Sequence, residues 1–325
     1  MKKSLYNIAI VGVGQIGSRH LQGLVKSSKQ LRIFLVDPNE KSLVVAEQRF
    51  KEVSNPADSS ISYHQSVNDL PKKIDLGIIA STANVRRKII ESLLEKCFVD
   101  FLILEKVVFQ RSEDFESIQK LFFDKKVKAW VNCPTRSYPF YNNLKKELVG
   151  RKISIEIKGN DWGLACNGFH IIDLLAFLTE QNDFVFNTDG LENIIFDSKR
   201  NGFNEFKGKL KIHTRRGDTL ELIDNVKYDD SHVISISNGS IQYNIFEREG
   251  LIVKHISENE IQEDNLKIQL QSELTGSIVD QIIDTGKSAL TSYDECMKYH
   301  IPMLDAFNNH ISKVTGKAVR ICPIT

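Results

Sequence analysis

Two side chains in the sequence are suited to proton transfer, and the first is Lys106. It follows Glu105 directly after the apolar run VDFLIL, residues 99–104, which has the character of a buried strand. An ammonium group at the end of such a strand can hydrogen-bond a substrate hydroxyl and assist proton transfer. A lysine that merely ends a strand and keeps its charge in water explains the same position equally well.

His170 is the second of these side chains, and it lies in the helical segment CNGFHIIDLLAFLTE, residues 166–180. Cys166, His170 and Asp173 fall at i, i+4 and i+7, so they share one face of the helix. Burying neutral polar groups without partners costs about 1 to 3 kcal/mol each. The pattern therefore indicates either a structural network, which the helix alone favours, or an acid–base site, for which histidine is well suited near neutral pH.

Three glycines near the start of the chain are spaced to hold a dinucleotide. In IAIVGVGQIGSRH, Gly12 allows a tight turn after a strand, Gly14 lets the backbone approach a pyrophosphate, and Gly17 lets the next helix pack closely. The phosphates would lie at the N-terminus of that helix, where free N–H groups and the helix dipole attract an anion. A glycine-rich turn that arose by chance is the alternative.

Asp37 supports the dinucleotide interpretation. It ends the apolar run LRIFLV and lies 20 residues after Gly17, where a carboxylate accepts hydrogen bonds from the ribose hydroxyls of NAD. The same carboxylate would repel a 2′-phosphate, so NAD is favoured over NADP. A turn aspartate before Pro38 is the alternative.

Short apolar segments alternate with helical ones through the first half of the chain, which predicts a parallel, doubly wound sheet. The expected strands are residues 8–11, 31–36, 61–63, 74–80, 99–104 and 127–132, and the expected helices include residues 15–25, 41–50 and 85–96. Ligands bind such sheets at the carboxyl ends of the strands. The predicted cofactor contacts are therefore Gly12, Gly14, Gln15, Ile16, Gly17, Asp37, Ser81, Thr82, Asn84 and Glu105.

The pattern changes after Asn132, where Pro134 and Pro139 flank Arg136. We place the domain boundary there, between residues 1–132 and residues 133–325. Alternating segments between residues 184 and 254 are separated by turn signals such as Asn-Gly and Glu-Gly, which predicts a mostly antiparallel sheet. Helices are expected at residues 140–148, 270–284 and 293–313.

Composition excludes several classes of function. The net charge of +1, from 43 Lys and Arg against 42 Asp and Glu, gives no reason to expect nucleic acid or an anionic membrane as a partner. Five cysteines without a Cys-x-x-Cys pair predict free thiols in a reducing cytosol, and the histidines have no metal-ligand spacing. Because no apolar run approaches the roughly 20 residues that span a membrane, we expect a cytoplasmic protein. From the histidine spacing we expect no bound metal.

The ordered combination of these motifs resembles the Gfo/Idh/MocA oxidoreductases. It consists of the Gly-x-Gly-x-x-Gly domain, the Glu105-Lys106 pair that closes the fifth strand, and the His-x-x-Asp helix that opens the second half. The resemblance implies an α/β protein in which an N-terminal Rossmann domain precedes a C-terminal α+β domain with an open, mostly antiparallel sheet. It also implies NAD, a sugar or cyclitol substrate, and assembly as a dimer or tetramer through the open sheet.

Residue by residue, Lys106 matches the lysine of the family's Glu-Lys-Pro motif and His170 matches the histidine of its Asp-x-x-x-His motif. In the family these two share proton transfer and substrate orientation. Val107 replaces the proline, which makes a cis peptide bond there improbable on sequence grounds. Cys166 replaces the aspartate, and a cysteine of ordinary pKa is no substitute for a carboxylate.

Several further residues are predicted to contact the substrate. Asp173 could orient the imidazole of His170 or be structural, and Arg136 with Pro139 is similar to a family Arg-x-x-Pro turn. The predicted set is Arg136, Trp162, Cys166, Asn167 and Asp173.

The leading hypothesis is an NAD-dependent oxidoreductase that acts on a hydroxyl or ketone of a sugar, a nucleotide-activated sugar or a cyclitol. One alternative is an NAD-using glycosidase of the same family, which cleaves through oxidation, elimination and re-reduction. The other is a non-catalytic NAD-binding regulator, which Val107 and Cys166 bring into consideration.

Overall fold

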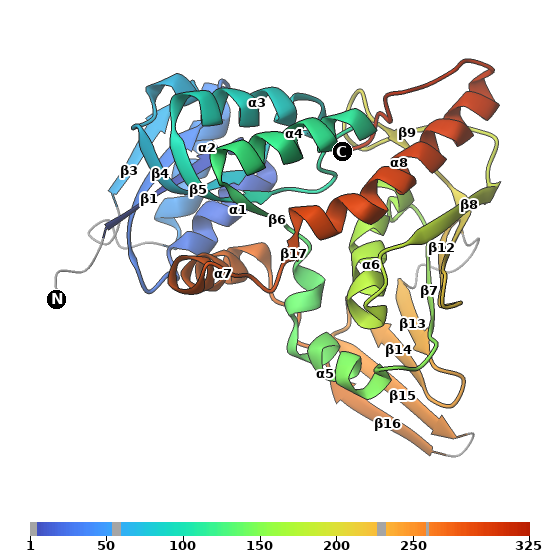
Figure 1. Ribbon diagram of the computed structural model, residues 1–325. Helices are drawn as coiled ribbons and strands as arrows, with labels where there is room; N and C mark the ends of the chain where they lie inside the picture. Colours follow the sequence, from blue (N-terminus) through green and yellow to red (C-terminus); the bar gives the residue numbers. More distant parts are fainter. Residues whose placement is uncertain (1–4, 54–59, 226–231, 258–259) are drawn as a thin grey trace. The chain divides into compact units, whose positions relative to one another are not determined.

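The computed structural model describes residues 5–53, 60–225, 232–257 and 260–325 (Figure 1). Its chain forms two compact units. The first contains residues Met1–Phe109, Glu113–Asn132 and Gln269–Asp294, and the second contains Gln110–Ser112, Cys133–Ile268 and Glu295–Thr325. The chain passes from the first unit to the second after Asn132, and the division into two functional domains at this point stays a prediction. Residues 269–294, by contrast, pack with the first unit although they lie late in the chain.

The first unit is built on a sheet whose described strands run in the order β17-β6-β5-β4-β1-β2-β3. Their bounds are Leu5–Val11 (β1), Gln30–Val36 (β2), Ser60–His64 (β3), Lys73–Ile79 (β4), Phe98–Leu104 (β5), Lys128–Val131 (β6) and Thr291–Ser292 (β17). β1 pairs in parallel with β2 and β4, and β17 pairs antiparallel with β6. Residues 8–11 of β1 are all buried, as expected for a parallel strand with both faces covered.

The helices of the first unit alternate with its strands. They are Gln15–Leu24 (α1), Glu40–Lys51 (α2), Ala83–Lys96 (α3), Ser112–Lys125 (α4) and Gln271–Thr285 (α7), with a short 3-10 turn at Val67–Asp69. The side chain of Asn39 starts α2 by accepting a hydrogen bond from the backbone of Lys41. This alternation is the doubly wound arrangement that the sequence predicted.

Helix α7 packs closely against α1 because glycines face each other. A Cβ atom on Gly276 would lie 2.7 Å from the carbonyl oxygen of Gly23, and one on Gly23 would lie 2.8 Å from that of Gln271. Any larger residue at either glycine would force the helices apart. The close approach brings the side chains of Gln271 and Thr275 against α1.

The second unit contains a larger, mostly antiparallel sheet of order β16-β15-β14-β13-β7-β12-β11-β8. Its strands are Ser154–Gly159 (β7), Phe184–Leu191 (β8), Gly208–Thr214 (β11), Thr219–Asp224 (β12), Val233–Ser237 (β13), Gln242–Phe246 (β14), Leu251–Ser257 (β15) and Glu260–Asn265 (β16). Among the described strands of this sheet, β7 and β12 form the parallel pair. Phe196–Asp197 (β9) and Asn204–Glu205 (β10) form a separate hairpin ladder. The predicted fold class is therefore confirmed.

The sheet of the second unit has one apolar and one polar face. In β7, buried Ile155 and Ile157 alternate with the more exposed Ser154, Glu156 and Lys158, which is the two-residue period of a half-buried strand. On the polar face Lys209 and Lys211 of β11 pair with Glu221 of β12. Assembly through this open face stays a prediction.

Helical segments of the second unit include Pro134–Ser137 (η2), Pro139–Leu148 (α5) and Leu164–Thr179 (α6). Tyr293–Thr315 (α8) begins where the first unit ends. Helix α6 is apolar nearly all round, and most of its side chains are buried. In the part of the chain that the structure describes, no helix has the length and apolar character needed to cross a membrane.

Candidate functional site

The glycine loop of the first unit has the geometry that a pyrophosphate requires. Gly12 has a φ of +86°, and a Cβ atom there would lie 2.6 Å from the backbone nitrogen of Ser81. A Cβ atom on Gly17 would lie 1.9 Å from the carbonyl oxygen of Gly12, whereas one on Gly14 would meet no atom within 4 Å. Gly12 and Gly17 are therefore fixed by the fold itself, and Gly14 leaves open space for a ligand.

Helix α1 begins directly after this open space. No side chain of the described residues caps its N-terminus at Gly14, so the first-turn N–H groups, which have no intrahelical acceptor, can bind an anion. Arg49 of α2 supports the turn, because its guanidinium donates hydrogen bonds to the side chains of Gln15 at 2.6 Å and Ser18 at 2.5 Å. The sequence pattern had not indicated this arginine.

Asp37 stands at the end of β2, beside the glycine loop. One carboxylate oxygen accepts a hydrogen bond from the backbone N–H of Val13, and the other accepts one from that of Asn39, both at 2.9 Å. The carboxylate is thereby fixed next to the loop, and each oxygen keeps a lone pair for a ribose hydroxyl. The geometry of these residues fits NAD, and their contacts with the cofactor stay a prediction.

The turn after β4 carries the next predicted cofactor contacts. Ser81 lies against Gly12, Thr82 occupies the N-cap position of α3, and Asn84 is exposed in the first turn of that helix. The backbone carbonyl of Ser81 accepts a hydrogen bond from the buried guanidinium of Arg86. This turn is therefore held beside the loop, while its contacts with a cofactor stay a prediction.

Glu105 is held by protein side chains. It is 6% exposed, and its Oε1 accepts hydrogen bonds from Nε2 of His20 at 2.9 Å and Nδ2 of Asn132 at 2.5 Å. Burial raises the pKa of Glu105, but these two donors and the charge of Lys106 outweigh it and lower the pKa to about 2. The carboxylate is thus ionised and its Oε1 is occupied by protein donors, while the predicted contact of Glu105 with the cofactor stays a prediction.

The Lys106–Val107 peptide bond is cis, so the expectation drawn from the missing proline is wrong. Burial and hydrogen bonds from a distant residue, rather than a proline ring, fix the position of this segment. Val107 and Val108 are fully buried, and their carbonyl oxygens accept hydrogen bonds from the guanidinium of Arg86, the second at 2.8 Å. An arginine that lies about 20 residues earlier could not be connected with this bond from the sequence pattern.

The second unit contains a pocket of about 530 Å³ that His170 lines. Trp162 and Asn167, both predicted substrate contacts, line it as well. The other lining residues are Pro134, Thr135, Tyr138, Ile157, Asp161, Ile171, Lys199, His232, Glu247, Arg248 and Ile268. The structure therefore brings three of the predicted residues together in one cavity.

Two carboxylates, the buried Asp224 and the half-buried Glu205, fix the turn at the start of α6. Asp224 accepts hydrogen bonds from the backbone N–H groups of Asp161 at 2.8 Å and Gly163 at 3.2 Å. Glu205 accepts them from Ala165 at 2.8 Å and Cys166 at 3.2 Å, and so caps the helix. The turn that leads into α6 is thus fixed before the helix reaches His170.

Trp162 and Asn167 are also held in place. The indole N–H of Trp162 donates to the carbonyl oxygen of Ile223 at 2.9 Å, and the side-chain amide of Asn167 donates to the carbonyl oxygen of Trp162 at 2.6 Å. The indole and the side-chain amide therefore have fixed orientations beside His170. An aromatic ring with nearby amide and hydroxyl groups suits a ligand that has apolar faces and polar edges.

Cys166 lies outside the pocket wall. Its Sγ is 2.7 Å from the main-chain oxygen of Thr325, to which it donates a hydrogen bond. The substitution of cysteine for the family's aspartate therefore leaves the cavity without a carboxylate from this position.

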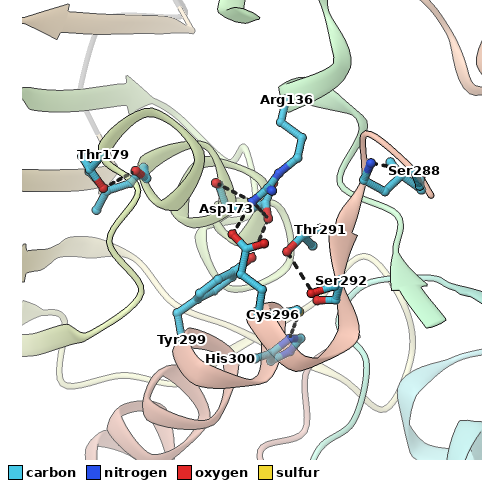
Figure 2. Close-up of polar contacts among 12 residues, drawn as sticks. Arg136, Asp173, Thr179, Ser288, Thr291, Ser292, Cys296, Tyr299 and His300 are labelled. Atoms are coloured by element: carbon cyan, nitrogen blue, oxygen red, sulfur yellow. Dashed lines mark hydrogen bonds and ion pairs between the residues drawn. The ribbon is translucent and has the colours of Figure 1, made fainter. Parts of the chain in front are cut away.

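Arg136 and Asp173 form a buried ion pair, as Figure 2 shows. The guanidinium donates to both carboxylate oxygens, at 2.9 and 2.8 Å, and the hydroxyl of Tyr299 donates to one of them at 2.6 Å. Asp173 is completely buried and Arg136 is 6% exposed. Neither residue lines the pocket. The carboxylate of Asp173 is bound by Arg136 and Tyr299, so both Arg136 and Asp173 lie in a buried ion pair and not among the pocket residues expected to contact the substrate.

The polar groups that the sequence did not single out come from separate elements. Tyr138 precedes α5, Lys199 follows β9, His232 precedes β13, and Glu247 and Arg248 follow β14. Burial raises the pKa of Glu247 and that of Tyr138, the latter to about 12, and it lowers the pKa of His232. In sequence each resembles an ordinary surface or loop residue, and no spacing relates them.

The cavity therefore combines hydrogen-bond donors, acceptors and the imidazoles of His170 and His232 with the aromatic rings of Tyr138 and Trp162. Such a set can bind a polyhydroxylated ring and exchange a proton with one of its hydroxyls. Among the described residues there is no cluster of three or more His, Cys, Asp or Glu side chains that could hold a metal ion.

A comparison with known protein families matches the N-terminal part of the chain to a family of NAD-binding proteins. The Gfo/Idh/MocA family model, described as an oxidoreductase family with an NAD-binding Rossmann fold, matches residues 6–133. This match confirms the resemblance noted from the motifs and the predicted cofactor, NAD. No curated protein matches the chain in sequence.

Solved structures share the fold over nearly the whole chain. UDP-N-acetylglucosamine 3-dehydrogenase from Acidithiobacillus ferrooxidans is 12% identical, with a TM-score of 0.71 over 93% of this chain and 97% of that one. A Gfo/Idh/MocA family oxidoreductase from Vibrio cholerae is 17% identical, with a TM-score of 0.70 over 96% and 100%. The transcriptional regulator Gal80p from Kluyveromyces lactis is 14% identical, with a TM-score of 0.70 over 100% and 96%. One fold thus serves both enzymes and a regulator.

Proposed function

We propose, because residues 6–133 belong to the Gfo/Idh/MocA oxidoreductase family, that this protein is an NAD-dependent dehydrogenase or reductase. Its substrate is a sugar, a nucleotide-activated sugar or a cyclitol that has a hydroxyl or ketone at the reacting carbon. The observation that carries the proposal is the pocket of the second unit, in which His170 lies among Trp162, Asn167 and other polar side chains.

The first unit binds the cofactor in this proposal. The N–H groups at the start of α1 would hold the pyrophosphate, and the Asp37 carboxylate would accept hydrogen bonds from the adenine-ribose hydroxyls. Bound NAD supplies the hydride acceptor, or the donor when it is reduced. Asp37 excludes a 2′-phosphate through charge repulsion, which sets the preference for NAD.

In this proposal His170 transfers the proton and Lys106 binds the reacting oxygen. When an alcohol is oxidised, the imidazole of His170 removes the hydroxyl proton while the hydride leaves the same carbon, and a carbonyl bond forms. Lys106 donates a hydrogen bond to the reacting oxygen and stabilises the negative charge that develops there. In the reverse direction His170 returns the proton to the oxygen.

The test is turnover by purified protein. Sugars, nucleotide sugars and cyclitols are incubated with NAD or NADH, and the absorbance of the reduced cofactor is followed. We expect one group of these compounds to be turned over, and His170→Asn and Lys106→Met to reduce kcat by at least about a hundredfold.

The matched controls are His213→Asn and Lys209→Met, which change exposed or half-exposed residues of β11 outside the pocket. Both should retain wild-type kcat. Full activity in the His170 and Lys106 variants would refute the assigned roles. Release of free sugar without net change in the cofactor would indicate the glycosidase reaction instead.

A non-catalytic NAD-binding regulator is the second candidate, and the position of Cys166 favours it. The thiol is turned toward Thr325, so position 166 contributes no acid–base group to the cavity. Tight binding of NAD, measured by calorimetry, without turnover of any compound in the screen would support this function. Unchanged partner binding in Lys106→Met would support it further.

A further inference from the structure

Four side chains of the first unit form a closed ring of hydrogen bonds around the Glu105 carboxylate. Oε1 of Glu105 accepts from Nε2 of His20 and Nδ2 of Asn132. The Asn132 amide also donates to Oε1 of Gln271 at 2.8 Å, and Nε2 of Gln271 lies 3.2 Å from Nδ1 of His20. Thr275 braces the ring through its hydroxyl, 3.0 Å from the same Nδ1.

The donors and acceptors of this ring complement one another. The Asn132 and Gln271 amides donate from their nitrogens, and Oε1 of Glu105 accepts two hydrogen bonds, from His20 and Asn132. Nδ1 of His20 lies within hydrogen-bond distance of the Gln271 amide and the Thr275 hydroxyl. The closed ring restrains its members, because rotation of any one side chain breaks two hydrogen bonds.

The ring joins elements that the proposed reaction uses. His20 lies on α1, the helix whose N-terminus follows the glycine loop, and Glu105 immediately precedes Lys106 at the end of β5. Asn132 follows the neighbouring strand β6, and Gln271 opens α7. Glu105, His20 and Asn132 are 6%, 1% and 3% exposed, so water does not compete for their hydrogen bonds.

We propose that this ring positions Lys106 relative to the cofactor helix, and that His20 is therefore a positioning residue for the reaction. The inference rests on the proposed function in so far as Lys106 contacts the reacting oxygen. His20 touches neither substrate nor cofactor in this role. It acts by holding Glu105, and with it the backbone of Lys106, at a fixed distance from α1.

Hydrogen exchange measures this coupling without any substrate. In His20→Leu the peptides that contain residues 104–108 and residues 15–24 should exchange backbone hydrogens about tenfold faster than in the wild type, because a buried carboxylate loses a partner. His20→Gln keeps an N–H donor for Glu105 and should restore most of the protection. The control Tyr293→Phe removes another buried hydrogen bond of the same unit, to the Phe115 carbonyl at 2.8 Å, and should leave both peptides unchanged.

Kinetics with the substrate found above provides the second measurement. A displacement of Lys106 should lower kcat about tenfold to a hundredfold in His20→Leu, while KM for NAD stays within about twofold. His20→Gln should recover most of the rate. If His20→Leu fails to fold, Gln271→Leu opens the same ring at a half-buried member.

Wild-type exchange at residues 104–108 in the ring variants would overturn the proposal, as would a loss of kcat no greater than that of Tyr293→Phe. Faster exchange with unchanged kcat would also overturn it, because Lys106 would then need no positioning. If the wild type turns over no compound, the proposed function fails, and the exchange experiment still decides whether the ring holds Lys106.

Discussion

Removing Arg136 should destabilise the protein strongly without altering substrate binding. In Arg136→Met the completely buried Asp173 carboxylate loses both guanidinium hydrogen bonds and keeps the Tyr299 hydroxyl at 2.6 Å. Breaking a buried ion pair from one side costs about 3 to 5 kcal/mol. For a unit of this size, each kcal/mol lowers Tm by roughly 2 to 4 °C, so we expect a decrease of about 6 to 20 °C at pH 7.

The effect should depend on pH in a defined direction. Burial already raises the pKa of Asp173, against the lowering by Arg136 and Tyr299, and loss of the guanidinium raises it further. The folded variant then holds a proton that the unfolded chain releases above its ordinary pKa. The destabilisation should be small near pH 4, grow as the pH rises, and become constant above the pKa of the folded state.

Calorimetric unfolding at pH 4.5 and pH 7 measures both effects. The double variant Arg136→Met, Asp173→Leu should regain most of the lost Tm, because it leaves no unpaired charge in the core. KM for an active substrate should match the wild type in the single variant at a temperature where it is folded. A normal Tm together with a raised KM would refute the structural role and restore Arg136 as a substrate contact.

Four further variants test the site, and one tests acid stability. Gly14→Ala should fold normally, because its Cβ meets no atom within 4 Å, yet weaken NAD binding at least about tenfold in titration calorimetry. Gly12→Ala, with a Cβ 2.6 Å from a backbone nitrogen, should instead lower Tm, and the reverse pattern would contradict the loop's role. Asp37→Ala should raise the affinity for NADP relative to NAD, and an unchanged ratio would show that the carboxylate does not set the preference. His170→Asn should leave the affinity for NAD within about twofold, which separates proton transfer from cofactor binding. Because Glu105 has its pKa lowered from 4.5 to about 2, it stabilises the fold above pH 4.5 and loses this contribution as the pH falls, so Glu105→Gln should flatten that part of the stability curve.

Local patterns were sufficient to predict the elements of the first unit. The strands expected at residues 31–36, 74–80 and 99–104 match β2, β4 and β5 to within one residue at either end. These strands are buried on both faces, so they appear in the sequence as continuous apolar runs between turn residues. The glycine loop was predictable from its spacing, although a Cβ atom on Gly12 would meet Ser81 after β4, and only Gly17 is restricted by an atom of the loop itself.

Contacts between distant segments were not predictable in the same way. The helix at residues 270–284 was expected, but its packing on α1 depends on the pairing of Gly23 with Gly276, about 250 residues apart. The hydrogen bonds from Arg86 to the segment after Lys106 are similar, since nothing in the sequence marks that arginine as buried. Isolated charged residues look like surface residues until the fold encloses them.

The polar face of α6 shows what helical spacing can predict and what it cannot. Cys166, His170 and Asp173 share a face as expected, yet seven residues of helix extend about 10 Å, so each turn meets different neighbours. The cysteine donates to Thr325, the aspartate binds Arg136, and the histidine lines the pocket. Because Cys166 and Asp173 both lie outside the cavity, the environment of His170 is set by Asn167 of the same helix and by residues of other elements, such as Tyr138 and Glu247, so the substrate must be sought from the cavity as a whole.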